Sequence, residues 1–181
     1  MMDVYKLPEA ACIGGREYPI DTDFRLCLRL LRQLEESPLP EVLRWQVAVT
    51  AFFLEPVPEA HLQEAMEFLA NFLTGGQTTE KPGPKLLDWG LDAPAIMAGV
   101  NRVAGMELRS LPKLHWWTFL SFFHSIGEGQ LSLLVGIRDK LRRGQKLESF
   151  EQEFYRENRA WVRMERPDPE KERLQNILNR R

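Results

Sequence analysis

The chain has 181 residues, of which 44% are hydrophobic and 28% are charged, and this balance is typical of a globular protein with a buried core. It excludes a globally disordered chain, and the lack of an apolar run of about 18 residues predicts no membrane span. The formal net charge is −2. Residues 1–137 carry 11 Lys/Arg and 17 Asp/Glu, whereas residues 138–181 carry 13 and 9, so a basic C-terminal region follows an acidic body.

The cysteine content and the N-terminus favour a soluble protein of a reducing compartment. Cys12 and Cys27 are too few for a disulfide framework or for a four-ligand zinc site. The first ten residues contain no basic stretch followed by an apolar one, so we expect no export signal.

The first half of the chain predicts a small hairpin and three helices. Gly14 and Gly15 can adopt the positive φ angles of a tight turn, which favours a hairpin over residues 11–21. Apolar residues then recur with helical spacing in three segments, separated by Ser37-Pro38 and by the prolines near residue 57. The predicted helices cover residues 24–36, 41–55 and 59–73, and Val42 falls on the apolar side of the second.

A Gly/Pro/Thr-rich linker over residues 75–85 precedes a second helical block. The first helix of this block is predicted to start after Asp92, which caps it, and the others start at about Pro112 and at Gln130. We therefore expect a mainly α protein, a bundle of about six helices with a small N-terminal β-hairpin. Residues 1–147 form the predicted helical domain, and residues 148–181 form a charged helical C-terminal extension. Phe150, Phe154 and Trp161 make an apolar stripe in this extension.

The sequence contains no catalytic or ligand-binding motif that we can recognise. It has no HExxH, no phosphate-binding glycine loop and no GxSxG elbow. His115 and His124 are nine residues apart, so they lie on opposite sides of one helix. We expect no enzymatic activity, no cofactor and no metal site.

The stretch LPKLHWWTFLSFF (111–123) is the most unusual in the chain, with His115, Trp116 and Trp117 in an apolar helix. Base stacking would need basic neighbours, and only Lys113 is basic. Packing between helices at the centre of the second helical block is the simplest interpretation, and an apolar groove for a partner helix is the alternative. Nucleic-acid binding by the basic C-terminal region is less favoured, since acidic residues occur throughout it.

Two separate motifs resemble the bacteriophage gene-product-fifteen family. GREYPIDTDFR (15–25) resembles the family's opening hairpin, of the type G-K-E-Y-P-I/V-N-T-D-F-R. Residues 86–138 resemble its second half, in which an aromatic-acidic stretch, here LDWGLD, precedes a helix. The hallmark L-H-W-W-x-F and a helix ending in I/Y-R follow. The resemblance covers about residues 11–143, with VAGMEL (103–108) as a loose match.

The resemblance implies a tail assembly chaperone of a long-tailed phage or prophage. Such a protein binds the hydrophobic tape-measure protein in the host bacterial cytoplasm, while the tail tube, a further candidate partner, assembles. The family's signature residues are the candidates for partner binding, and apolar or basic side chains of the extension are candidates for a second contact. The first set is Trp89, His115, Trp116, Trp117 and Phe119, and the second is Trp161, Arg163, Leu174, Ile177 and Leu178. The alternatives are a structural tail or connector component of the virion and a nucleic-acid-binding regulator; the oligomeric state stays open.

Overall fold

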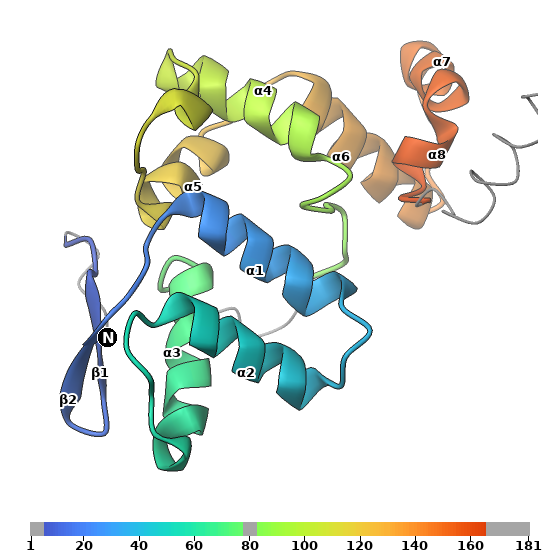
Figure 1. The fold of residues 1–181 in the computed structure, drawn as a ribbon. Coiled ribbons are helices and arrows are strands. Elements are labelled where there is room, and N and C mark those ends of the chain that lie inside the picture. The colour runs from blue at the N-terminus through green and yellow to red at the C-terminus, as the bar shows by residue number, and fades with distance from the viewer. Residues whose placement is uncertain (1–5, 78–82, 166–181) are drawn as a thin grey trace, which may run out of the picture. The chain divides into compact units, whose positions relative to one another are not determined.

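The computed structural model describes residues 6–77 and 83–165, which form a hairpin and eight α-helices (Figure 1). The mainly α fold with an N-terminal β-hairpin is confirmed. The strands are β1 (Ala10–Ile13) and β2 (Arg16–Pro19), and two short 3₁₀ helices are η1 (Glu59–His61) and η2 (Leu108–Ser110). The α-helices are α1 (Phe24–Glu36), α2 (Glu41–Phe52), α3 (Leu62–Leu73), α4 (Ala93–Ala104), α5 (Trp116–His124), α6 (Gln130–Arg142), α7 (Ser149–Glu157) and α8 (Arg159–Val162).

The chain divides into two compact units. Unit 1 contains the chain up to Pro84 together with Ile96–Ile126. Unit 2 contains Lys85–Ala95 and the chain from Gly127 onward. This division differs from the expected boundary at residue 147, because α6 forms a core with α7 and α8. Leu134 and Ile137 of α6 pack there with Leu147 and Val162.

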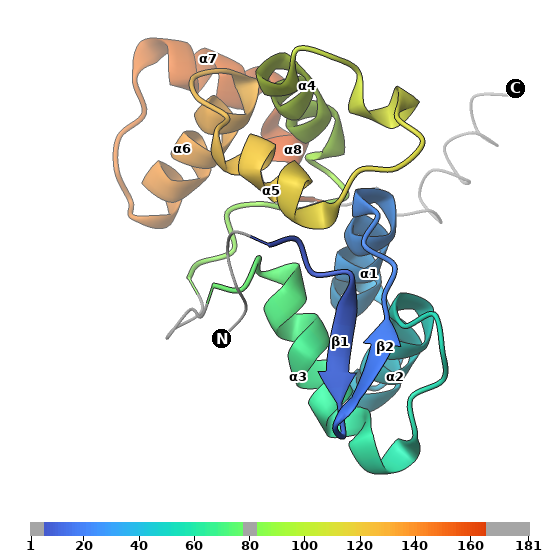
Figure 2. The ribbon, with the colours of Figure 1, turned by 90° about the vertical axis from the view of Figure 1, so that its left-hand side faces the viewer.

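The hairpin of unit 1 follows the predicted design. Ala10 pairs with Pro19 and Ile13 with Arg16, and the two-residue turn between the strands has φ angles of 57° and 78° at Gly14 and Gly15. Positive φ at both central positions is the geometry of a type I′ turn. The hairpin lies along α3, which β1 contacts (Figure 2), so the apolar side chains of this small sheet are buried against a helix.

Three neighbouring helices, α1, α2 and α3, supply much of the core of unit 1. α1 contacts α2, and α2 contacts α3. All three predicted helices are confirmed. The Asp23 carboxylate caps α1 by accepting a hydrogen bond from the Arg25 N–H. The fully buried side chains include the aromatic residues Phe24, Phe52, Phe72 and Phe119 beside aliphatic ones such as Leu69.

The packing partners of α5 differ from those we expected. The sequence places LPKLHWWTFLSFF at the centre of the second helical block, but α5 contacts α1, and its Trp116 and Trp117 side chains reach the end of α3. Phe119 of α5 stacks on Phe24 of α1 with ring centroids 4.9 Å apart. The segment thus completes the core formed by the first three helices.

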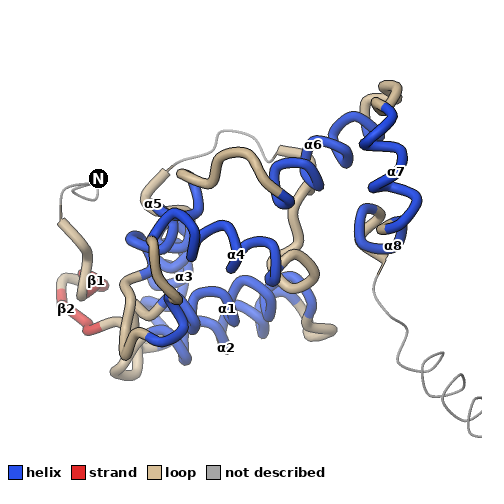
Figure 3. Tube along the Cα trace, turned by 90° about the horizontal axis from the view of Figure 1, so that it is seen from above, coloured by secondary structure: helices blue, strands red, loops and turns tan. Residues whose placement is uncertain are grey.

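In unit 2, α6 ends where predicted, at Arg142 followed by Gly144 with φ 66°. The expected C-terminal extension is helical in its described part, where α7 and α8 contact each other and α6 (Figure 3). Phe154 and Trp161 pack on the unit's core. Phe150, whose spacing suggested a buried position, is 61% exposed instead.

Candidate functional site

His115 is the N-cap of α5 and uses both of its ring nitrogens. Its Nδ1 accepts from the Trp117 N–H at 3.1 Å, and its Nε2 lies 3.1 Å from the Pro8 carbonyl oxygen. Because Nδ1 is an acceptor, the proton of the neutral ring sits on Nε2 and is donated to Pro8. Burial holds the pKa of His115 below its ordinary value. The ring therefore connects the chain ahead of β1 to the start of α5.

Trp116 and Trp117 donate hydrogen bonds to carbonyl groups at the end of α3. The Trp116 indole N–H donates to the Leu73 carbonyl and the Trp117 indole N–H donates to the Phe72 carbonyl, each at 3.0 Å. Both carbonyls belong to the last turn of α3, and that of Phe72 also accepts from the Gly75 N–H at 3.0 Å. Trp116 is fully buried and Trp117 is 8% exposed. The signature therefore docks α5 on α3 through paired hydrogen bonds as well as apolar packing.

The edge of Trp117 borders a shallow pocket. The pocket has a volume of about 240 Å³, and its wall includes Gly75, Gly76, Leu120 and His124. Trp117 is thus the one signature aromatic that combines core packing with a place beside a surface hollow. Phe119 is buried, and Trp89 is half-buried in the turn ahead of α4.

Unit 2 contains a buried ion pair that the sequence did not lead us to expect. Arg138 of α6 is 4% exposed and Asp92 is fully buried. The Nη1 and Nη2 atoms of Arg138 donate to the two carboxylate oxygens of Asp92 at 2.6 and 2.9 Å. The guanidinium also donates to the carbonyls of Leu86, Trp161 and Val162, so it joins three segments of the unit.

This ion pair brings together two parts of the family resemblance. Asp92 ends LDWGLD, and Arg138 is the arginine of the I/Y-R helix ending. We expected Asp92 to cap the following helix. The helix does begin at Ala93, but the carboxylate accepts from Arg138 and from the Trp161 indole N–H at 2.8 Å. The signal was present as an arginine inside an apolar helix, which requires a buried partner.

The candidates in the extension have separate positions. Trp161 is half-buried and bonded to Asp92. Arg163 is exposed, and its Nε donates to the Tyr155 hydroxyl at 2.8 Å. Leu174, Ile177 and Leu178 lie outside the described residues. The structure therefore does not gather the described candidates into one site.

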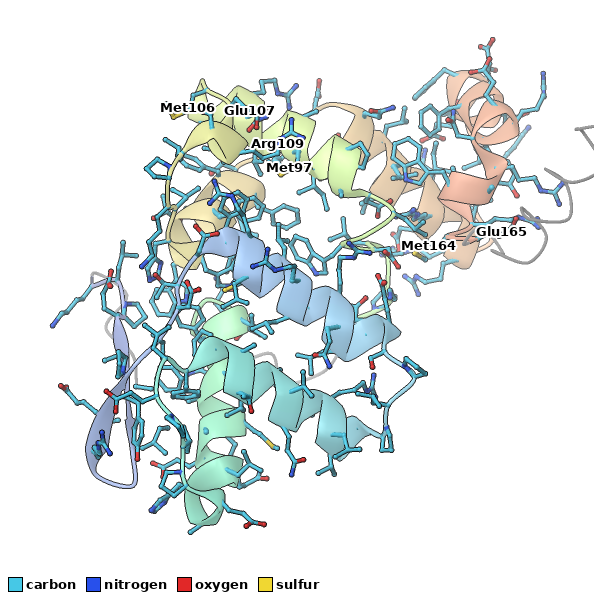
Figure 4. All side chains as sticks on the ribbon, in the orientation of Figure 1. Met97, Met106, Glu107, Arg109, Met164 and Glu165 are labelled. Atoms are coloured by element: carbon cyan, nitrogen blue, oxygen red, sulfur yellow. The ribbon has the colours of Figure 1, made fainter. Side chains whose placement is uncertain are left out.

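A small charged network caps η2 beside an exposed methionine. Glu107 accepts from the Arg109 side chain, and these hydrogen bonds hold the pKa of its carboxyl at about 2. Figure 4 shows both residues next to Met106, and Met106 is 51% exposed. Asn101 of α4 donates to Glu107 and accepts from the Leu108 N–H, so the loosely matching VAGMEL segment is a locally bonded helix ending.

The most exposed apolar surface lies on α2 and was not predicted. Leu43 and Val47 lie four residues apart on α2, and Leu39 and Leu54 flank its two ends. We name these exposed residues the α2 apolar row. The row consists of Leu39, Leu43, Val47 and Leu54, each between 43% and 64% exposed. Large apolar side chains gathered on one exposed helix face are typical of a surface that contacts another protein.

A groove between α2 and α3 adjoins this row, and we name it the α2–α3 groove. It has a volume of about 320 Å³. It is lined by Glu41, Val42, Trp45, Gln63, Met66, Glu67 and Ala70. We expected Val42 to lie on the buried side of its helix, but it is 63% exposed at the edge of the groove. Trp45 and Met66 are half-buried.

Metal-binding clusters and membrane-spanning helices are both absent from the described residues. No cluster of three His, Cys, Asp or Glu side chains there could hold a metal ion. Nor does any helix in residues 6–77 and 83–165 have the length and apolar character needed to cross a bilayer.

These features define a mainly helical protein with signature residues in its core and apolar side chains exposed on α2. The chain belongs to the Bacteriophage Gp15 protein family, whose sequence model matches residues 4–164. Membership indicates a phage structural or assembly protein. No curated protein and no solved structure matches the chain significantly.

Proposed function

We propose that this protein is a tail assembly chaperone that binds the hydrophobic tape-measure protein of a long-tailed phage. The family membership supports a role in building the phage particle. The observation that carries the narrower proposal is the α2 apolar row together with the α2–α3 groove. An aggregation-prone helical partner can be held by a rigid apolar helix face without any chemical step.

The proposal assigns no catalytic step and no cofactor. It assigns the binding of tape-measure segments to unit 1, with action in the host bacterial cytoplasm. The signature tryptophans then contribute indirectly. They fix the C-terminal end of α3, and this helix forms one wall of the groove. The tail tube protein is a second partner in this proposal, engaged while the tube grows around the tape-measure protein.

The protein content of purified virions tests this proposal against its main alternative. An assembly chaperone leaves before the particle is complete, so quantitative mass spectrometry of virions should find this chain far below the level of tail tube subunits. A fixed, stoichiometric amount in the virion would instead make it a structural tail or connector component.

A further inference from the structure

The α2–α3 groove combines an apolar floor with an acidic edge. Val42, Trp45 and Met66 supply apolar surface, while Glu41 and Glu67 lie among the lining residues, and none of the seven is Lys or Arg. Glu67 is held in place on its helix by a hydrogen bond from the Gln63 side chain at 2.8 Å. Such a groove suits apolar side chains flanked by cations.

The sequence around the groove strengthens this charge asymmetry. Residues 35–77 contain seven glutamates and a single Lys/Arg residue, Arg44, which gives a formal charge of −6. The Arg44 guanidinium donates to the Leu34 carbonyl at the end of α1. Arg32 and Arg16 pair with Glu36 and Glu55 from outside this range. Three cations therefore stand against seven carboxylates, and this part of unit 1 keeps a negative potential.

We propose that the α2–α3 groove binds an amphipathic helix whose apolar side chains are flanked by Lys or Arg. This inference rests on the proposed function and names the kind of tape-measure segment that the chaperone holds. The apolar side chains enter the groove over Val42 and Met66, and the cations face Glu41 and Glu67. The thioether of Met66 adapts its shape to differing apolar side chains, which suits a partner that presents many similar segments.

The size of the surface sets the length of the bound segment. α2 has 12 residues and is therefore about 18 Å long. A bound helix of about three turns would span it, with anchors at positions i, i+3, i+4 and i+7. The α2 apolar row then contacts the side of the same helix or the next segment of the partner.

A pair of synthetic peptides tests the groove directly. One is an amphipathic Leu/Lys helix with leucines three and four residues apart, and the other has Glu in place of every Lys. Fluorescence anisotropy with the full-length protein should show at least about tenfold tighter binding of the Lys peptide, which corresponds to about 1.4 kcal/mol. Its affinity should fall with added salt, since exposed charges are screened. Equal affinity for both peptides would contradict the acidic edge.

Matched variants locate the binding. Val42→Glu should weaken the Lys peptide about tenfold or more, and Val42→Gln about threefold, whereas Phe150→Glu on α7 should leave it unchanged. Glu41→Gln with Glu67→Gln should weaken it about threefold to tenfold, whereas Glu17→Gln with Glu128→Gln alters the net charge equally and should have no effect. Unchanged circular dichroism verifies folding. Equal effects of groove and control variants would overturn the proposal.

Other occupants of the groove give distinct results. If the protein sediments as a dimer that Val42→Glu dissociates, the groove is an interface between copies and the proposal is wrong. If a chain ending at Glu165 binds the Lys peptide more than about tenfold tighter than the full chain, the protein's own C-terminal residues occupy the groove, which also contradicts it.

Co-expression with the tape-measure protein separates this inference from the proposed function. If wild type keeps that protein soluble and Val42→Glu does so equally well, the chaperone function stands and the groove inference fails. If the Lys peptide binds the groove but wild type does not keep the tape-measure protein soluble, the groove stands and the proposed function fails.

Discussion

His115 shows how a residue that looks chemical in the sequence serves the fold. Its ring accepts from the start of α5 and donates to Pro8, so neither nitrogen is left to bind an added proton without losing a hydrogen bond. Burial, and to a lesser degree the Lys113 charge, holds its pKa below the ordinary value of about 6.5. The neutral ring is therefore the form that the folded protein requires.

The free energy of unfolding should consequently depend on pH through His115. The unfolded chain binds a proton below about pH 6.5, while the folded chain resists it, so stability is fully present above that pH and is lost as pH falls. His115→Asn keeps a side-chain acceptor at the N-cap and should flatten this dependence. Urea unfolding between about pH 7.5 and about pH 5 measures the difference between the two proteins. Parallel curves for wild type and variant would contradict the assigned role.

The Asp92–Arg138 pair gives a second prediction at this scale. Removing one charge leaves the other buried without its partner, so Arg138→Met or Asp92→Asn should cost about 3–5 kcal/mol each. The double variant buries no unpaired charge, and its cost should be well below the sum of the single costs. Amide hydrogen exchange in α6 reports the local free energy of opening. Additive costs would show that the two side chains are not coupled.

At the scale of elements, helix positions were predictable because each depends on local signals. Spacing of apolar residues, a capping Asp23 and the glycines after α3 and α6 all act within a few residues of each other. The second apolar face of α2 was not predictable in the same way. Val42, Leu43 and Val47 are as hydrophobic as core residues, and only the positions of α1 and α3 decide which side of α2 is covered.

Two helical glycines allow a matched test of this packing. A Cβ added at Gly136 of α6 would meet nothing within 4 Å, so Gly136→Ala should stabilise the protein by about 0.5–1 kcal/mol through helix propensity. A Cβ at Gly99 of α4 would lie 2.7 Å from the Ile126 Cδ1 atom. Gly99→Ala should therefore lower the free energy of unfolding by about 1 kcal/mol. Thermal unfolding of the two variants checks both signs, and a stabilising Gly99→Ala would show that Ile126 moves freely.

At the scale of the whole molecule, the division into units depends on contacts between distant segments. Arg138 bonds to Asp92, 46 positions earlier, and Trp116 bonds to Leu73, 43 positions earlier. Neither pairing is encoded in local periodicity, so the sequence pattern assigned α5 and α6 to one block although they belong to different units. The family motifs marked the residues involved, but they did not say which would meet.

The proposed function of the whole molecule rests on its surface more than on its signature residues. His115, Trp116, Trp117 and Phe119 are conspicuous in the sequence, yet they pack unit 1 internally. The α2 apolar row has no conspicuous motif, but it is exposed where a helical partner could bind. Core residues thus identify the family, and surface residues carry the proposed activity.

The solubility of the tape-measure protein tests this account most directly. Co-expression of that protein with wild type, with Val47→Glu from the α2 apolar row, or without this chain compares its soluble fraction in each lysate. We predict that it is largely soluble with wild type and largely aggregated without this chain. Val47→Glu should give an intermediate or aggregated result while the variant itself stays folded. Equal solubility with and without this protein would contradict the chaperone function.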